Sequence, residues 1–228
     1  IGQLRQSDLV GRFSSEGGKV PRIAKYGQRS WQDFLHVADV LRQLTTDERF
    51  PLVRRLVHGL RFCSLLDSCR LNKLDDKEFR ELIVILTASA TESVSELFSE
   101  RVAPSKMTAI LFRQSAVHFI RSHPTYSRAN SVLDRLRLLL ASVRYAWGGH
   151  KIPALHPEFS ARQFMTLEQP LGPLAPSLFQ PLNRYFESNV YSLQYVIGNQ
   201  HGSLVESYRT LVFGFPMALW MLRLAIGS

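Results

Sequence analysis

The sequence has few of the features on which small catalytic and metal-binding proteins depend. It holds two cysteines, Cys63 and Cys69, in 228 residues, with no C-x-x-C or H-x-x-x-H spacing. A metal centre built by this chain alone is therefore not expected. It also lacks a G-x-x-x-x-G-K-[ST] loop, a G-x-G-x-x-G loop and a G-x-S-x-G elbow. Nucleotide-binding loops and hydrolase chemistry thus have no support.

A hydrophobic run long enough to cross a membrane is missing as well. The longest apolar stretch, residues 210–226, contains Pro216 and Arg223, whereas a membrane span needs about 20 apolar residues. We therefore expect a buried terminal helix there and no membrane span. No signal peptide is visible, and two reduced thiols are typical of the cytoplasm, so we expect a cytoplasmic protein.

Acidic residues are outnumbered by basic ones, 19 to 28, which gives a formal net charge of +9. Such a surface can attract nucleic acid, anionic lipid or an acidic protein. Because the basic residues are scattered along the chain, nucleic-acid binding is the weakest of these interpretations. The plainer alternative is a helical protein whose arginines coat its outer faces.

Helical periodicity dominates the chain, and no alternation typical of a strand continues for more than a few residues. With 45% apolar residues, the chain can bury a sizeable core. We predict an all-α fold, an irregular multi-helix bundle of about seven or eight helices. Residues 1–29 are predicted to be a flexible leading segment, and 30–228 a single helical domain. Six prolines between 151 and 181 predict an irregular connector with one short helix around 160–168.

Three helix starts pair a capping residue with an acid three residues later, which is the capping-box pattern. In the helix after Pro51, Leu56 and Cys63 fall on one apolar face, and Arg55 is expected to lie off it. The centre of the helix predicted at 74–102 reads "LIVIL", which predicts burial on most sides. The capping pairs are Ser30–Asp33, Asp75–Glu78 and Ser203–Glu206.

Residues 184–209 gather aromatic, charged and amide side chains around a glycine-flanked turn. Two interpretations are open: these side chains line a pocket for a charged ligand, or they join two helices by hydrogen bonds. Residue chemistry favours the second, and no catalytic residue is assigned. The candidates for substrate or cofactor binding are Arg184, Tyr185, Glu187, Asn189, His201, Tyr208 and Arg209.

The same segment resembles a known family. "LNRYFESNVYSLQYV", a short glycine-containing turn and "SLVESYRTLVFGFPMALWMLRLAI" are similar to the C-terminal region of the flagellin lysine-N-methylase family. There a tyrosine-glutamate-asparagine helix precedes a turn and a final apolar helix, and Tyr185 and Glu187 match that pattern. Residues 34–60 are similar too, because the family has a helix, a short break and a helix with an arginine-leucine pair, here Arg55-Leu56.

The resemblance implies the helical domain of a protein lysine N-methyltransferase that contributes substrate or cofactor binding. Family members use S-adenosylmethionine, act on a surface protein such as flagellin, and hold an iron–sulfur cluster with cysteines of an N-terminal region. This chain lacks those cysteines and starts at Ile1. We therefore expect a piece of a longer enzyme, with a cluster only if a cysteine-rich region lies upstream, and no methyl transfer by these residues alone. The alternative is a non-enzymatic helical interaction module whose basic surface binds an acidic protein.

Overall fold

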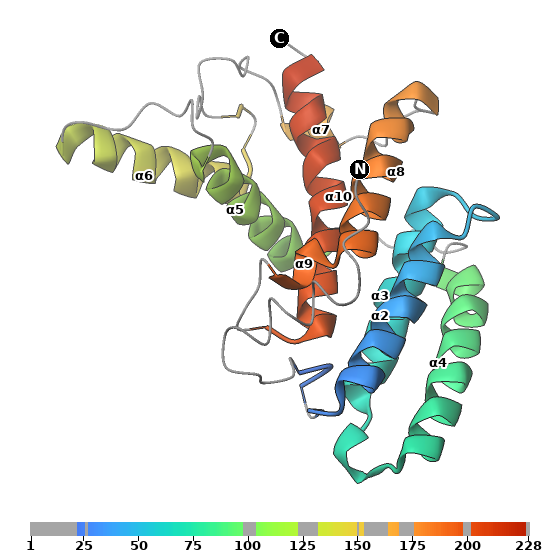
Figure 1. The fold of residues 1–228 in the computed structure, drawn as a ribbon. Coiled ribbons are helices and arrows are strands. Elements are labelled where there is room, and N and C mark those ends of the chain that lie inside the picture. The colour runs from blue at the N-terminus through green and yellow to red at the C-terminus, as the bar shows by residue number, and fades with distance from the viewer. Residues whose placement is uncertain are drawn as a thin grey trace. The chain divides into compact units, whose positions relative to one another are not determined.

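The computed structural model describes residues 22–25, 27–97, 104–122, 132–149, 151–152, 164–168, 176–197 and 202–226. These residues are mainly helical (Figure 1), and their one bridge between extended segments joins Ala24 to Gly27. The predicted all-α fold of about seven or eight helices is confirmed. The longer helices are α2 (Trp31–Thr46), α3 (Leu52–Ser68), α4 (Asp76–Leu97), α5 (Lys106–Ser122), α6 (Val132–Trp147), α7 (Phe164–Glu168), α8 (Pro176–Ser192) and α10 (Leu204–Ile226), and the shorter ones are η1 (Leu71–Lys73) and α9 (Gln194–Ile197).

The chain folds as two compact units, where the sequence predicted a single domain over 30–228. Unit 1 comprises residues 1–100 and 174–213, and unit 2 comprises residues 101–173 and 214–228. Helix α10 therefore contributes its first part to unit 1 and its last part to unit 2. In unit 1, α3 packs against both α2 and α4, and α2 also packs against α8; in unit 2, α5 packs against α6.

Part of the predicted leading segment is built into unit 1. Ile23 is fully buried, and the carbonyl oxygens of Arg22 and Ile23 accept hydrogen bonds from the Leu204 and Val205 N–H groups at 2.8 and 3.1 Å. Those N–H groups belong to the first turn of α10, where a helix offers no acceptor of its own. Residues 22–25 thus complete the start of α10, while residues 1–21 lie outside the described part of the chain.

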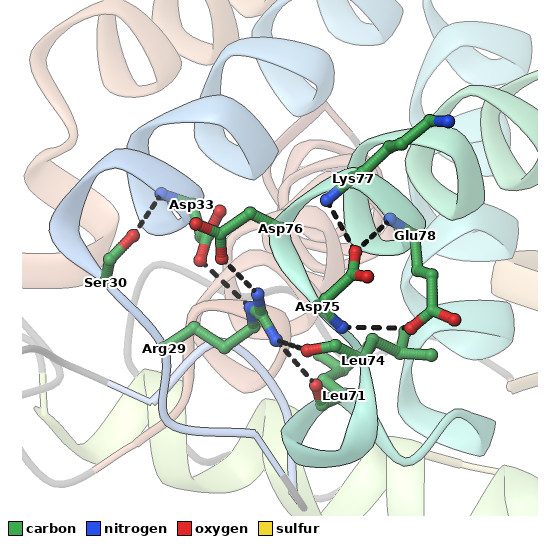
Figure 2. A network of polar contacts seen from close by, with 9 residues as sticks. All are labelled: Arg29, Ser30, Asp33, Leu71, Leu74, Asp75, Asp76, Lys77 and Glu78. Atoms are coloured by element: carbon green, nitrogen blue, oxygen red, sulfur yellow. Dashed lines mark hydrogen bonds and ion pairs between the residues drawn. The ribbon is translucent and has the colours of Figure 1, made fainter.

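Arg29, at the end of the same segment, joins the start of α2 to the start of α4 (Figure 2). Its guanidinium donates hydrogen bonds to Asp33 Oδ2 and Asp76 Oδ1, both at 2.9 Å, and to the carbonyl oxygens of Leu71 and Leu74 at 2.9 and 2.8 Å. A largely buried guanidinium with carboxylate and carbonyl partners is well compensated for its lost hydration. Arg29 therefore holds the starts of α2 and α4 together in unit 1.

The capping box predicted at the start of α4 is present, whereas the one predicted at the start of α2 is present only in part (Figure 2). The Asp75 N–H donates to Glu78 Oε2 at 2.9 Å, and the Glu78 N–H donates to Asp75 Oδ1 at 2.8 Å, which completes the box. At α2, Ser30 Oγ accepts from the Asp33 N–H at 3.2 Å. The Asp33 carboxylate completes no box, because it turns to Arg29.

The connector predicted at 151–181 is shorter than expected. Helix α7 at Phe164–Glu168 confirms the short helix predicted around 160–168. Helix α8 already begins at Pro176 and contains Pro181, so the irregular connector does not extend to residue 181. A proline at the first helical position sacrifices no hydrogen bond, because the N–H there would have no helical acceptor.

The prediction that the centre of α4 is buried on most sides is wrong. Ile83 and Leu86 face the core, but Val84 and Ile85 are 66% and 63% exposed. Helix α4 packs against α3, and one neighbouring helix covers only one side. Among the described residues, no helix, α10 included, combines the length and apolar character that crossing a membrane requires.

Unit 2 has a core of its own, to which α6 contributes Tyr145. The Trp220 Nε1–H donates a hydrogen bond to Tyr145 Oη at 2.7 Å, and both side chains are buried. Burial raises the pKa of Tyr145 to about 12. The buried residues of this core are Ala116, Val117, Ile120, Tyr145, Ile152, Phe164, Leu167, Met217, Trp220 and Leu224.

Candidate functional site

Arg55 of α3, expected off the apolar face, is 4% exposed. Its Nη2 donates to Asn183 Oδ1 at 2.9 Å, and its Nη1 donates to the Thr45 carbonyl at 3.2 Å and to Glu187 Oε1 at 3.3 Å. A charge in the core is tolerated when a counterion and further acceptors surround it. Glu187, a candidate binding residue, is therefore the counterion of a buried arginine and ties α8 to α3.

Tyr208 of α10 is another candidate, and its side chain is fully buried. Its Oη lies 2.8 Å from Thr45 Oγ1, which itself donates to the Leu41 carbonyl at 2.7 Å. The tyrosine hydroxyl is thus the donor to Thr45, and burial raises the pKa of Tyr208 well above its usual range. The Tyr208 ring lies so close to Gly59 that a Cβ at position 59 would overlap its hydroxyl. Tyr208 is a core contact between α10, α2 and α3.

Arg209 and the predicted capping box also join elements of unit 1. Arg209 Nη1 donates to Asp67 Oδ2 of α3 at 2.7 Å. The Ser203 N–H donates to Glu206 Oε2 at 2.7 Å, and the Glu206 N–H donates to Ser203 Oγ at 3.2 Å. The hydrogen bonds that the Ser203 N–H and hydroxyl donate to the Glu206 carboxylate lower the pKa of Glu206. The box predicted at 203–206 is present.

The remaining candidates do not converge on one point. Asn189 Nδ2 donates to the Tyr185 carbonyl of its own helix at 2.9 Å, while the side chains of Arg184 and Tyr185 are exposed. His201 lies outside the described residues. Within the described part of 184–209, the observed contacts are those of helices joined by hydrogen bonds.

Burial limits the reactivity of the Cys63 thiol. The thiol is buried, and burial raises its pKa to about 12, so it is protonated at neutral pH and a poor nucleophile. Cys69 is a free, half-buried cysteine. The described ranges contain no group of three or more histidine, cysteine, aspartate or glutamate residues that could hold a metal ion.

Helix α6 of unit 2 exposes an apolar face that no sequence pattern had marked as functional. Side chains advance by about 100° per residue on a helix, so this face occupies an arc of about 120°. Exposed contiguous apolar patches of this kind mark interaction sites. Seven large apolar residues, between 49% and 81% exposed, form it: Val132, Leu133, Leu136, Leu139, Leu140, Val143 and Trp147. We call these seven residues the α6 face.

Five members of the α6 face follow the alternating three- and four-residue spacing of a coiled-coil seam. On another side of the same helix, Tyr145 is buried in the unit 2 core, so the most buried side of α6 is not the α6 face. The sequence contained one indication of this face. The apolar residues of α6 extend around more of the helix than one buried stripe, because Tyr145 lies outside the α6 face. The five seam residues are Leu133, Leu136, Leu140, Val143 and Trp147.

A comparison of the chain with family models, with curated proteins and with solved structures gave no match. The resemblance to flagellin lysine-N-methylases therefore stays a prediction. The function is inferred from the contacts and exposed surfaces of the chain itself.

Proposed function

We propose that the chain is a helical protein-interaction module that binds a helix of another protein on the α6 face. The observation that carries this proposal is the exposure of the seven apolar side chains at seam spacing. Burying one leucine or valine stabilises a complex by about 1.5–3 kcal/mol relative to leaving it in water. Amphipathic helices recognise such faces through residues at matching spacing, and Trp147 offers an aromatic anchor at one end.

The α6 face is favoured over residues 184–209 because its side chains are between 49% and 81% exposed in the described structure. Glu187, Tyr208 and Arg209 make hydrogen bonds to other elements of unit 1. The α6 face is exposed to water. Leaving this much apolar surface in water is unfavourable, and a bound partner removes that surface from water.

The test is binding of a synthetic helical peptide to the full chain. The peptide carries leucine at both seam positions of each heptad and glutamine at the flanking positions. Leu136→Asp combined with Leu140→Asp should weaken binding by at least about a hundredfold, because two leucine burials are lost. Val84→Asp combined with Ile85→Asp places the same changes on the exposed part of α4 and should bind like the unchanged chain. The proposal is wrong if the unchanged chain does not bind, or if both double variants bind equally well.

A second proposed function is the helical domain of a protein lysine N-methyltransferase, acting with S-adenosylmethionine on a protein such as flagellin. It is supported by one observation: Arg55 and Glu187, from the two separate segments that carry the resemblance, form an ion pair with each other. An iron–sulfur cluster belongs to this proposal only together with a cysteine-rich upstream region. Either function would be exercised in the cytoplasm.

Ligand binding tests this second function. A ligand that binds only the folded chain raises its melting temperature, so S-adenosylmethionine should raise it if this domain holds the cofactor. S-adenosylhomocysteine serves as a second probe, and adenosine monophosphate as the control. An unchanged melting temperature with both probes would exclude cofactor binding by this chain.

A further inference from the structure

We infer that the helix bound by the α6 face carries acidic residues along both edges of its apolar stripe. This inference rests on the proposed interaction function and adds the chemistry of the partner. It follows from the side chains that border the α6 face, since charges beside an apolar seam decide which partner and which orientation are accepted.

The α6 face has basic borders on both sides. With about 100° per residue, Arg135 lies about 40° beyond Leu139 at one edge, and Arg144 lies about 20° beyond Leu133 at the other. The side chains of Arg135 and Arg144 are both exposed. Arg144 occupies the coiled-coil position that faces a flanking residue of the bound helix. A carboxylate there would meet a guanidinium, the pairing with the best hydrogen-bond geometry.

A second copy of this chain does not fit that pattern. Helix α6 contains three arginines and one acidic residue, Asp134, and the whole chain carries a net charge of +9. Two α6 faces packed together would bring arginine borders of the same sign into contact, which disfavours the complex. The positive charge of the chain also speeds its association with an acidic partner.

Three peptides test the inference. All carry the leucine seam, and their flanking positions hold glutamate, glutamine or lysine. Exposed ion pairs contribute modestly, so the full chain should prefer the glutamate peptide to the lysine peptide by about tenfold at low salt. The preference should shrink as salt is added, because screening acts on exposed charges first.

Charge reversal on α6 should reverse the preference. In the variant with Arg135→Glu and Arg144→Glu, the lysine peptide should bind more tightly than the glutamate peptide. Arg70→Glu with Arg80→Glu makes the same change of net charge at exposed positions of unit 1 and should keep the original order.

The outcomes separate this inference from the proposed function. Equal binding of all three peptides overturns the acidic-partner inference and leaves the interaction function intact. Failure of every peptide, the glutamine peptide included, overturns the interaction function itself. Dimerisation of the chain in sedimentation experiments, abolished by Leu136→Asp with Leu140→Asp, would make a second copy the occupant and would also overturn the inference.

Discussion

Helices α3 and α6 are nearly equal in length, 17 and 16 residues, but they place charged and apolar side chains in opposite ways. Helix α3 buries Arg55 and His58, whereas α6 leaves Leu136 and Leu140 more than half exposed. Helix α3 packs against both α2 and α4, while α6 packs mainly against α5. In these two helices, the number of neighbouring helices, and not the residue type alone, determines which side chains are buried.

The largest difference between the two helices is expected for leucine truncation. Leu56 of α3 is 1% exposed, so Leu56→Ala should lower the free energy of unfolding by about 3 kcal/mol through lost burial and a new cavity. Leu136→Ala on α6 should change it by less than about 0.5 kcal/mol, because that side chain already faces water. Urea denaturation of both variants measures the contrast. Equal losses would mean that the α6 face is covered in solution.

Loss of the buried arginine should be almost as damaging. Arg55→Met leaves Glu187 and Asn183 without their donor, and removing one partner of a buried ion pair costs about 3–5 kcal/mol. We expect the free energy of unfolding to fall by about 3 kcal/mol, at the lower end of that range, because a third of the Glu187 side chain remains exposed to water. Arg80→Met, at an exposed arginine of α4, should be nearly neutral in the same denaturation experiment. A neutral Arg55→Met would show that the Arg55 contacts do not hold α8 to α3.

Two glycines contrast a crowded position on α3 with an open position on α10. Gly59→Ala puts a methyl group into the Tyr208 ring and should cost about 1–3 kcal/mol. Gly214→Ala lies within α10, where an added Cβ meets nothing within 4 Å. It should therefore stabilise the protein by up to about 1 kcal/mol. Thermal unfolding should give melting temperatures that move in opposite directions, and a shared direction would contradict the packing of Tyr208 on α3.

The smallest expected effect is the pH dependence that comes from His58. Burial is the main cause that lowers the pKa of His58, and the nearby positive charge of Arg54 lowers it further. The Arg54 Nε–H donates to His58 Nε2 at 3.4 Å, a contact that requires the neutral ring. An unfolded histidine binds its proton near pH 6.5. The folded chain binds that proton only at lower pH, so stability is retained above about pH 6.5 and falls as the pH drops below it.

Denaturation at a series of pH values measures this effect. His58→Gln, which cannot take up a proton, should remove part of the loss of stability below about pH 6.5. An identical pH profile for the variant would show that folding does not lower the pKa of His58.

Local features of unit 1 could be predicted from the sequence, and long-range ones could not. The capping boxes at Asp75–Glu78 and Ser203–Glu206 were correct because each involves residues three apart. The burial of Arg55 depends on acceptors at Asn183 and Glu187, more than 120 residues away. Periodicity contains no information about such acceptors, so it left Arg55 on the wrong side of its helix.

The candidate site shows the same limit. An apolar stripe in a sequence predicts a face that avoids water, but it does not tell whether the same chain covers that face. Leucine is the most frequent residue both in the α6 face and among the buried residues of α3, and the packing separates the two sets. Residues 184–209 were predicted as a candidate site because they are rich in polar side chains. Three of these side chains, Glu187, Tyr208 and Arg209, form hydrogen bonds with Arg55, Thr45 and Asp67 elsewhere in unit 1.

Fluorescence of Trp147 during titration with the glutamine-flanked peptide tests the central claim most directly. Trp147 is 73% exposed, whereas Trp220 is buried in the unit 2 core. A peptide without tryptophan that docks on the α6 face should shift the emission to shorter wavelength in a saturable way, and Trp147→Phe should abolish the shift. No shift, or a shift that persists in Leu136→Asp with Leu140→Asp, would contradict the claim that the α6 face binds a partner helix.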